Sequence, residues 1–166
     1  MTRPLTVAAV RESLTAEQWA RLERINPHLV APVAKARERG ELVEANAQRN
    51  GSRVDLVAKG LRLDLTPNAR LHPQVVARRR AREHQVIERA LRGITPPAGP
   101  WRVVIVRVGP RAMDDDNRTA SAKGVRDAVA RWLGVDDGDG SVAWEVRGEV
   151  SRGYAVRVIV EGGESR

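Results

Sequence analysis

The sequence predicts an α+β fold, with a small mixed β-sheet packed against helices. Segments in which apolar and polar side chains alternate are interspersed with segments of helical periodicity. These segments do not follow the regular strand–helix–strand repeat that is typical of a parallel α/β sheet. We therefore expect a mixed sheet within residues 60–166, preceded by a helical extension over residues 1–59.

The expected extension contains two predicted helices. Thr15-Ala16-Glu17-Gln18 has the pattern of a capping box, which predicts a helix that begins here and ends near Ile25. A second, highly charged helix is expected from Pro32 to Gln48, before the breaker Asn50-Gly51. Large apolar side chains are few in this part, so we interpret it as an arm rather than a core.

The second part of the chain carries the expected sheet. The short segment Ser151-Arg152-Gly153 lies between the last two predicted strands and indicates that they form a hairpin. A loop is expected from Thr95 to Pro100, which is rich in proline and glycine. The predicted elements are a strand at Gly60–Leu65, helices at Pro73–Leu91 and Asn117–Leu133, and strands at Trp101–Val108, Val142–Val150 and Tyr154–Glu161.

Composition limits the classes of function. The formal net charge of +8 and the pI of about 11.2 favour a polyanionic partner, although an ordinary basic protein is the alternative. The chain has no cysteine and three histidines at spacings unlike paired zinc ligands, which excludes thiol chemistry and thiolate zinc sites. Apolar runs are too short to span a membrane and no signal-peptide core is found, so we expect a cytoplasmic protein.

Two groups of aspartates flank the helix expected at Asn117–Leu133. In an extended chain Asp114 and Asp116 point to the same side, about 6–7 Å apart, and Asp115 points away. A third carboxylate can come from Asp136 or Asp137, and the sequence alone does not decide between them. Such all-oxygen ligation suits a hard divalent cation, Mg²⁺ or Mn²⁺.

The same aspartates have purely structural interpretations. Asp116 could cap the helix, and Asp137 to Gly140 could be a polar turn. A cap needs one aspartate rather than three in a row, which favours the metal hypothesis. An EF-hand loop is excluded, because placing Gly140 at its sixth position puts Val135 and Val146 where carboxylates are required.

Lys123 is the candidate for the compensating positive charge. It follows Asp116 by seven residues, which is two helical turns, so we expect both on one side of the helix. Lys123 could contact the scissile phosphate or stabilise the transition state. The alternative is a surface ion pair with Asp127, four residues further on, and the sequence leaves both open.

The helix expected at Pro73–Leu91 is strongly basic. Arginines in adjacent turns can neutralise successive phosphates of a nucleic acid, although a solvated face is the alternative. The lack of aromatic side chains among them argues against a single-strand stacking platform and favours recognition of the DNA backbone. The candidate DNA-binding residues are Arg70, Arg78, Arg79, Arg80 and Arg82.

Together these motifs resemble the signature of the RusA-type Holliday junction resolvases. The resemblance rests on Met113–Asn117, on Lys123 with Asp127, and on Trp132–Asp137. It extends over residues 60–161, and the first 59 residues have no counterpart. Lys123 comes about one turn later than in the best-known members of the family. A proline-rich motif upstream is represented only by Thr66-Pro67-Asn68.

The resemblance implies a RusA-like fold and an Mg²⁺-dependent endonuclease that acts as a homodimer and nicks four-way DNA junctions. It implies that Asp114, Asp116 and Asp137 bind the metal and that Lys123 acts in catalysis together with Asp116. A phage or prophage origin is also expected. The alternative function is a non-catalytic DNA-binding accessory protein of a phage, in which the acidic residues only cap a helix.

Overall fold

The computed structural model describes residues 15–25, 43–64 and 71–163. The chain divides into two compact units, residues 1–42 and 43–166. The described part of the first unit is helix α2 (Ala16–Ile25). The predicted capping box is confirmed: the Thr15 hydroxyl accepts from the Gln18 amide at 3.2 Å, and the Gln18 side chain accepts from the Thr15 amide at 2.9 Å.

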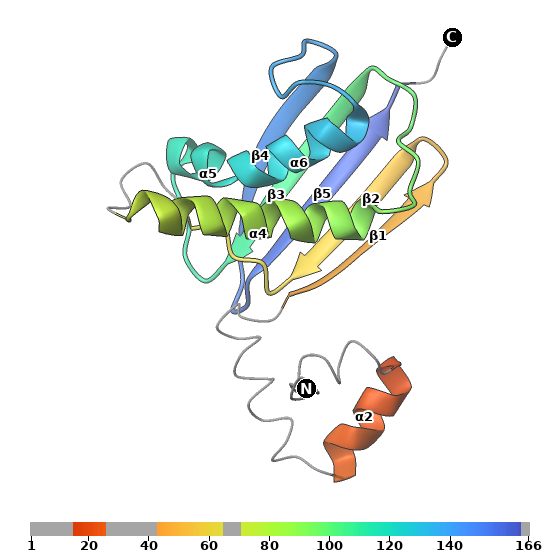
Figure 1. The fold of residues 1–166 in the computed structure, drawn as a ribbon, viewed down its shortest axis with the longest axis vertical. Coiled ribbons are helices and arrows are strands. Elements are labelled where there is room, and N and C mark those ends of the chain that lie inside the picture. Colours follow the sequence, from red (N-terminus) through yellow and green to blue (C-terminus); the bar gives the residue numbers. More distant parts are fainter. Residues whose placement is uncertain (1–14, 26–42, 65–70, 164–166) are drawn as a thin grey trace, which may run out of the picture. The chain divides into compact units, whose positions relative to one another are not determined.

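The second unit contains a five-stranded mixed sheet in the order β1-β2-β5-β3-β4. Only β3 and β4 run parallel; the other neighbours are antiparallel. Three helices, α4, α5 and α6, lie over one face of this sheet (Figure 1). The strands are β1 (Glu44–Asn50), β2 (Arg53–Lys59), β3 (Trp101–Gly109), β4 (Val142–Val150) and β5 (Ala155–Gly162); the helices are α4 (Pro73–Leu91), α5 (Asp115–Ser121) and α6 (Lys123–Leu133). The expected α+β class is confirmed.

The core lies between the sheet and its helices. Alternate residues of β2, β3 and β5 point toward the helical layer, and α4 and α6 contribute their apolar stripes to the same cluster. Its largest fully buried side chains are Leu56, Leu63, Ile87, Ile105, Val54, Val103, Val125, Val129, Val156, Val158 and Val160. No helix within the described ranges is long and apolar enough to cross a membrane.

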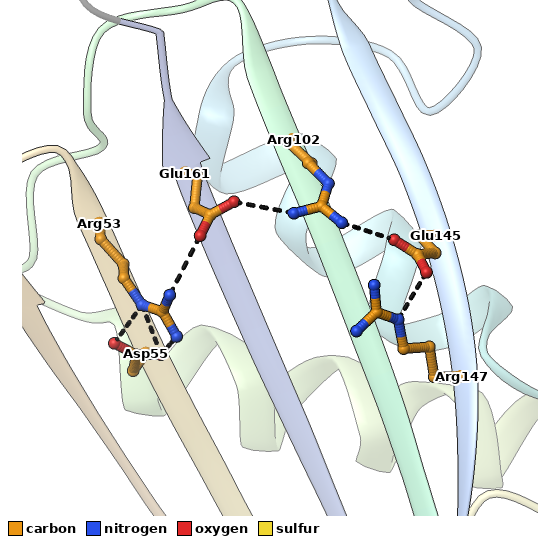
Figure 2. Close-up of polar contacts among 6 residues, drawn as sticks. All are labelled: Arg53, Asp55, Arg102, Glu145, Arg147 and Glu161. Atoms are coloured by element: carbon orange, nitrogen blue, oxygen red, sulfur yellow. Dashed lines mark hydrogen bonds and ion pairs between the residues drawn. The ribbon is translucent and has the colours of Figure 1, made fainter.

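The opposite face of the sheet carries a row of ion pairs that crosses four strands (Figure 2). We call it the charge ladder; its members are Arg53, Asp55, Glu161, Arg102, Glu145 and Arg147. The same face carries a small apolar cluster of Val104, Val106 and Val108 on β3, in which Val104 is 2% exposed. The stems of long charged side chains can cover apolar surface in this way while their charged ends stay in water.

Two predictions for the first 65 residues are wrong. Residues 44–48 of the second expected helix belong to β1, and residues 32–42 lie outside the described residues. Asn50-Gly51 ends no helix but joins β1 to β2, with Gly51 at φ +61°. The strand expected at Gly60–Leu65 is irregular over 61–64, although its alternation is real: Leu61 and Leu63 are buried. The hairpin at 44–59 is therefore part of the sheet, not of a helical extension.

Two further predictions are wrong in the second unit. The helix expected at Asn117–Leu133 is divided at Ala122 into α5 and α6. The last two strands were expected to form a hairpin, but β3 lies between β4 and β5 and pairs with both. The Ser151 amide donates to the Gly109 carbonyl at 3.0 Å, so the connection passes the end of β3 instead of turning back onto β4.

Candidate functional site

Asp114 begins helix α5 by capping it. Its carboxylate accepts hydrogen bonds from the Asn117 amide at 2.9 Å and from Asn117 Nδ2 at 2.7 Å. The bond from the Asn117 amide is the main reason why the pKa of Asp114 is lowered from its ordinary value. The expected extended arrangement of Asp114 and Asp116 is therefore wrong, because the cap bends the chain into a helix directly after Asp114.

Asp115 and Asp116 occupy the first turn of α5 and differ in their contacts. Asp115 pairs with Arg118, whose Nη1 also donates to the Met113 carbonyl at 3.2 Å. Arg118 in turn packs on Gly148 of β4, where a Cβ would lie 3.1 Å from Nη1. Asp116 is exposed, and its side chain forms no hydrogen bond or ion pair within the described residues. Asp114 and Asp115 are exposed as well, so Asp116 differs from them in having no partner in the described part of the chain rather than in being accessible.

Lys123, at the start of α6, lies between two carboxylates. Its ammonium is 3.2 Å from Asp127 Oδ1 and 3.5 Å from Asp137 Oδ2. The hydrogen bond to Asp127 is the main reason why the pKa of Lys123 is raised. The structure thus brings Lys123 to Asp137, and it also forms the alternative pair with Asp127 that the helical spacing predicted.

The chain after α6 is held against that helix. Gly134 ends α6 with φ +77°, as expected for a glycine at this position. Arg126 Nη2 donates to the Asp137 carbonyl at 2.7 Å, and the Arg126 guanidinium lies 4.9 Å from the centre of the Trp144 ring. Asp137 is therefore fixed beside Lys123, whereas Asp136 is exposed. Both aspartates line a shallow hollow together with Asp127.

The predicted metal ligands are only partly brought together. Asp114 and Asp116 share the beginning of α5, and Asp137 lies against Lys123. Among the residues that the structure describes, no group of three or more His, Cys, Asp or Glu side chains is arranged to hold a metal ion. Lys123 was expected on the same side as Asp116 only if one continuous helix carried both, and the break at Ala122 removes that premise.

Helix α4 has the basic exposed surface that the sequence predicts. Arg78, Arg79, Arg80 and Arg82 are exposed on it, and Arg70 lies outside the described residues. Arg79 pairs with Asp64 at 2.8 Å, so this arginine is partly neutralised by the segment that precedes the helix. The side chain of His72 accepts from the Gln74 amide at 3.3 Å and caps the helix.

Glu83 of α4 is an unusual residue that was not predicted. It is 2% exposed, and its Oε2 has no hydrogen-bond partner within the described structure. A Cβ on Gly124 of α6 would overlap that oxygen, so the glycine makes room for the carboxyl group. Burial raises the pKa of Glu83 to about 7. The sequence contained a signal: Glu83 lies one turn before Ile87, in the apolar stripe of the helix.

The comparisons with known proteins do not assign the chain to a family. No protein-family model matches it, and no curated protein matches it either.

Proposed function

We propose that this chain is a metal-dependent, structure-selective endodeoxyribonuclease of the RusA type. It would resolve Holliday junctions or other branched DNA by hydrolysing phosphodiester bonds, and so would act in DNA recombination and repair. The observation that carries the proposal is the contact between Lys123 and Asp137. Lys123 begins α6 directly after α5, the helix whose first turn carries Asp116. An ammonium group beside carboxylates is suited to a phosphodiester and a divalent cation.

The candidate ligands have the chemistry that Mg²⁺ or Mn²⁺ requires. Asp114, Asp116 and Asp137 offer hard carboxylate oxygens, with Asp136 as the alternative to Asp137. Mg²⁺ usually takes only one or two protein carboxylates and keeps several waters, so the exposed Asp116 is a sufficient starting point. When bound, the ion would lower the pKa of a water and stabilise the leaving oxygen.

The role of Lys123 follows from its contacts. Because Asp127 and Asp137 raise its pKa, Lys123 carries a full positive charge at neutral pH. A permanently protonated amine cannot accept a proton from water, so Lys123 would not be the general base. It would instead stabilise negative charge on the phosphate, and the DNA would exchange places with one of its two carboxylate partners.

The exposed arginines of α4 would hold the DNA backbone. Contacts of this kind fix the position of a duplex without reading its sequence, which suits an enzyme that selects a branched shape. A homodimer would present two such sites to the opposed strands of one junction. The candidate residues on the described part of α4 are Arg78, Arg79, Arg80 and Arg82.

The decisive experiment compares Asp116→Asn with Asp55→Asn on a labelled four-way junction in Mg²⁺, in Mn²⁺ and in EDTA. Asp116→Asn should lower cleavage by at least about 1,000-fold while junction binding stays within a factor of about three. Asp55→Asn makes the same chemical change on the opposite sheet face and should cut normally. Undiminished cutting by Asp116→Asn would mean that the site is wrongly assigned.

A second candidate function has its own supporting observation. Both oxygens of Asp114 are used to cap α5, as expected if the acidic residues only shape the fold. The chain would then be a non-catalytic DNA-binding accessory protein. In the same experiment, this function predicts junction binding with no nicking in either metal by the unsubstituted protein.

A further inference from the structure

Arg107 is a charged residue on the core side of strand β3. The strand alternates Val103, Ile105 and Arg107 on this side, and Arg107 is only 6% exposed. Charged side chains are rarely buried to this degree unless their donors are satisfied. An arginine that continues a row of buried aliphatic side chains therefore needs a specific explanation.

The guanidinium of Arg107 is held by backbone carbonyls from two separate segments. Its Nε donates to the Leu63 carbonyl at 3.0 Å, and its Nη1 donates to the Arg111 carbonyl at 2.9 Å. No ion pair of Arg107 with a carboxylate is found within the described ranges. The group lies over Gly109, where a Cβ would stand 3.1 Å from Nη2. Glycine at this position lets the planar group lie flat between the two segments.

Each of these segments leads directly to a part of the candidate site. The Arg111 carbonyl lies in the connection between β3 and α5, three residues before Asp114. The Leu63 carbonyl precedes Asp64, which pairs with Arg79 of α4 at 2.8 Å. One buried side chain therefore links the segment that ends in the acidic turn to the segment that is tied to the basic helix.

From this geometry we propose that Arg107 is a positioning residue. It clamps the 110–113 connection against the 61–64 segment, and so fixes the first turn of α5, with Asp114 and Asp116, relative to α4. Where it concerns metal and DNA, this inference rests on the proposed function; the clamp itself does not. Because the partners are carbonyls on both sides, an apolar side chain of similar length leaves both acceptors without a donor.

The test compares Arg107→Met with Arg102→Met by hydrogen–deuterium exchange. Arg102 lies on the same strand but points into the charge ladder on the other face, so it is a matched control. We expect amides in residues 110–118 to exchange about 10-fold faster in Arg107→Met, with α6 and β5 little changed. Arg102→Met should leave the exchange of 110–118 unaltered. A merely structural role would raise exchange throughout the sheet instead.

Arg107→Lys is the second variant, because it keeps the charge and can donate to one of the two carbonyls. It should give an intermediate exchange rate in 110–118, and it replaces Arg107→Met if that protein does not fold. Unchanged exchange in residues 110–118 in a folded Arg107 variant would overturn the proposal.

A second measurement separates this inference from the proposed function. If the unsubstituted protein cuts junctions, Arg107→Met should raise the Mg²⁺ concentration for half-maximal cleavage by about 10-fold while junction affinity stays within about threefold. If the unsubstituted protein does not cut, the nuclease proposal fails, yet the exchange experiment still decides whether Arg107 is a clamp. Uniformly faster exchange, with no local effect, would contradict the clamp in either case.

Discussion

Glu83 and Glu145 belong to the same folded unit but lie on opposite sides of its sheet. Glu83 is buried between α4 and α6 with one oxygen unpartnered, whereas Glu145 lies in the charge ladder between Arg102 and Arg147. Burial raises the pKa of Glu83 to about 7, while the hydrogen bond from Arg147 lowers the pKa of Glu145. The contributions of these two carboxyl groups to the stability of the fold therefore change with pH in opposite directions.

The same contrast extends to the arginines of the two faces. The charge ladder contains three arginines and three carboxylates, so its net formal charge is zero. The face that carries the helices instead has exposed arginines on α4, and one of them, Arg78, forms no ion pair with a residue that the structure describes. Charges that are already paired gain little from a polyanion, so we expect DNA on the helical face.

The largest expected effect concerns Glu83. Its pKa is raised above that of the unfolded chain, so it favours folding fully below pH 4.5 and this contribution is lost as pH rises through about 7. The shift corresponds to at most about 3 kcal/mol. Glu83→Gln, which never ionises, should remove this decline. Urea unfolding at pH 5, 6, 7 and 8 measures it.

Glu145→Gln is the control for that experiment. Because the pKa of Glu145 is lowered, its contribution is present above the unfolded value of about 4.5 and is lost only as pH falls below it. Glu145→Gln should therefore leave the slope of unfolding free energy against pH unchanged between pH 5 and 8. If Glu83→Gln kept the slope of the unsubstituted protein, the loss of stability with rising pH would not be caused by the buried Glu83 carboxyl group.

A smaller effect is expected when two arginines are removed from each face in turn. Arg78→Gln with Arg80→Gln should weaken junction binding by about 10-fold and reduce the salt slope by about 2. Arg102→Gln with Arg147→Gln lowers the net charge equally, yet should leave both quantities nearly unchanged. Fluorescence anisotropy across a KCl series measures both. Equal losses for the two pairs would show that only total charge matters.

Elements with strong local signals were predicted accurately from the sequence. Helix α4 and strand β4 have the predicted bounds, because a proline at the helix start and a clear alternation are local properties. Strand β1 was missed because it is a polar edge strand. Ala47 is its one partly buried residue, so the strand has no alternation of apolar and polar side chains. The predicted hairpin between β4 and β5 was wrong because β3 pairs with both of them, and such pairing is a property of the whole sheet.

The candidate site was predicted in composition but not in geometry. The sequence identified Lys123 and Asp137 as candidates, and in the structure Lys123 Nζ lies 3.5 Å from Asp137 Oδ2. It placed Asp116 beside Asp114 on a strand, because alternation cannot show that the Asp114 carboxylate will cap a helix. Glu83 and Arg107 were missed although both interrupt apolar stripes, since only the fold shows which polar residues in a stripe remain buried.

The smallest expected effect concerns the charge ladder itself. Arg102 bridges Glu161 at 3.2 Å and Glu145 at 2.9 Å, but Arg53 still pairs with Glu161 and Arg147 with Glu145. The Arg102 side chain is also 52% exposed, so water screens both pairs. Arg102→Met should therefore change Tm by no more than about 2 °C in thermal unfolding. A fall in Tm of about 8 °C or more would mean that the ladder acts as a cooperative unit. The sheet face that carries the ladder would then contribute to stability, as the face packed against the helices does.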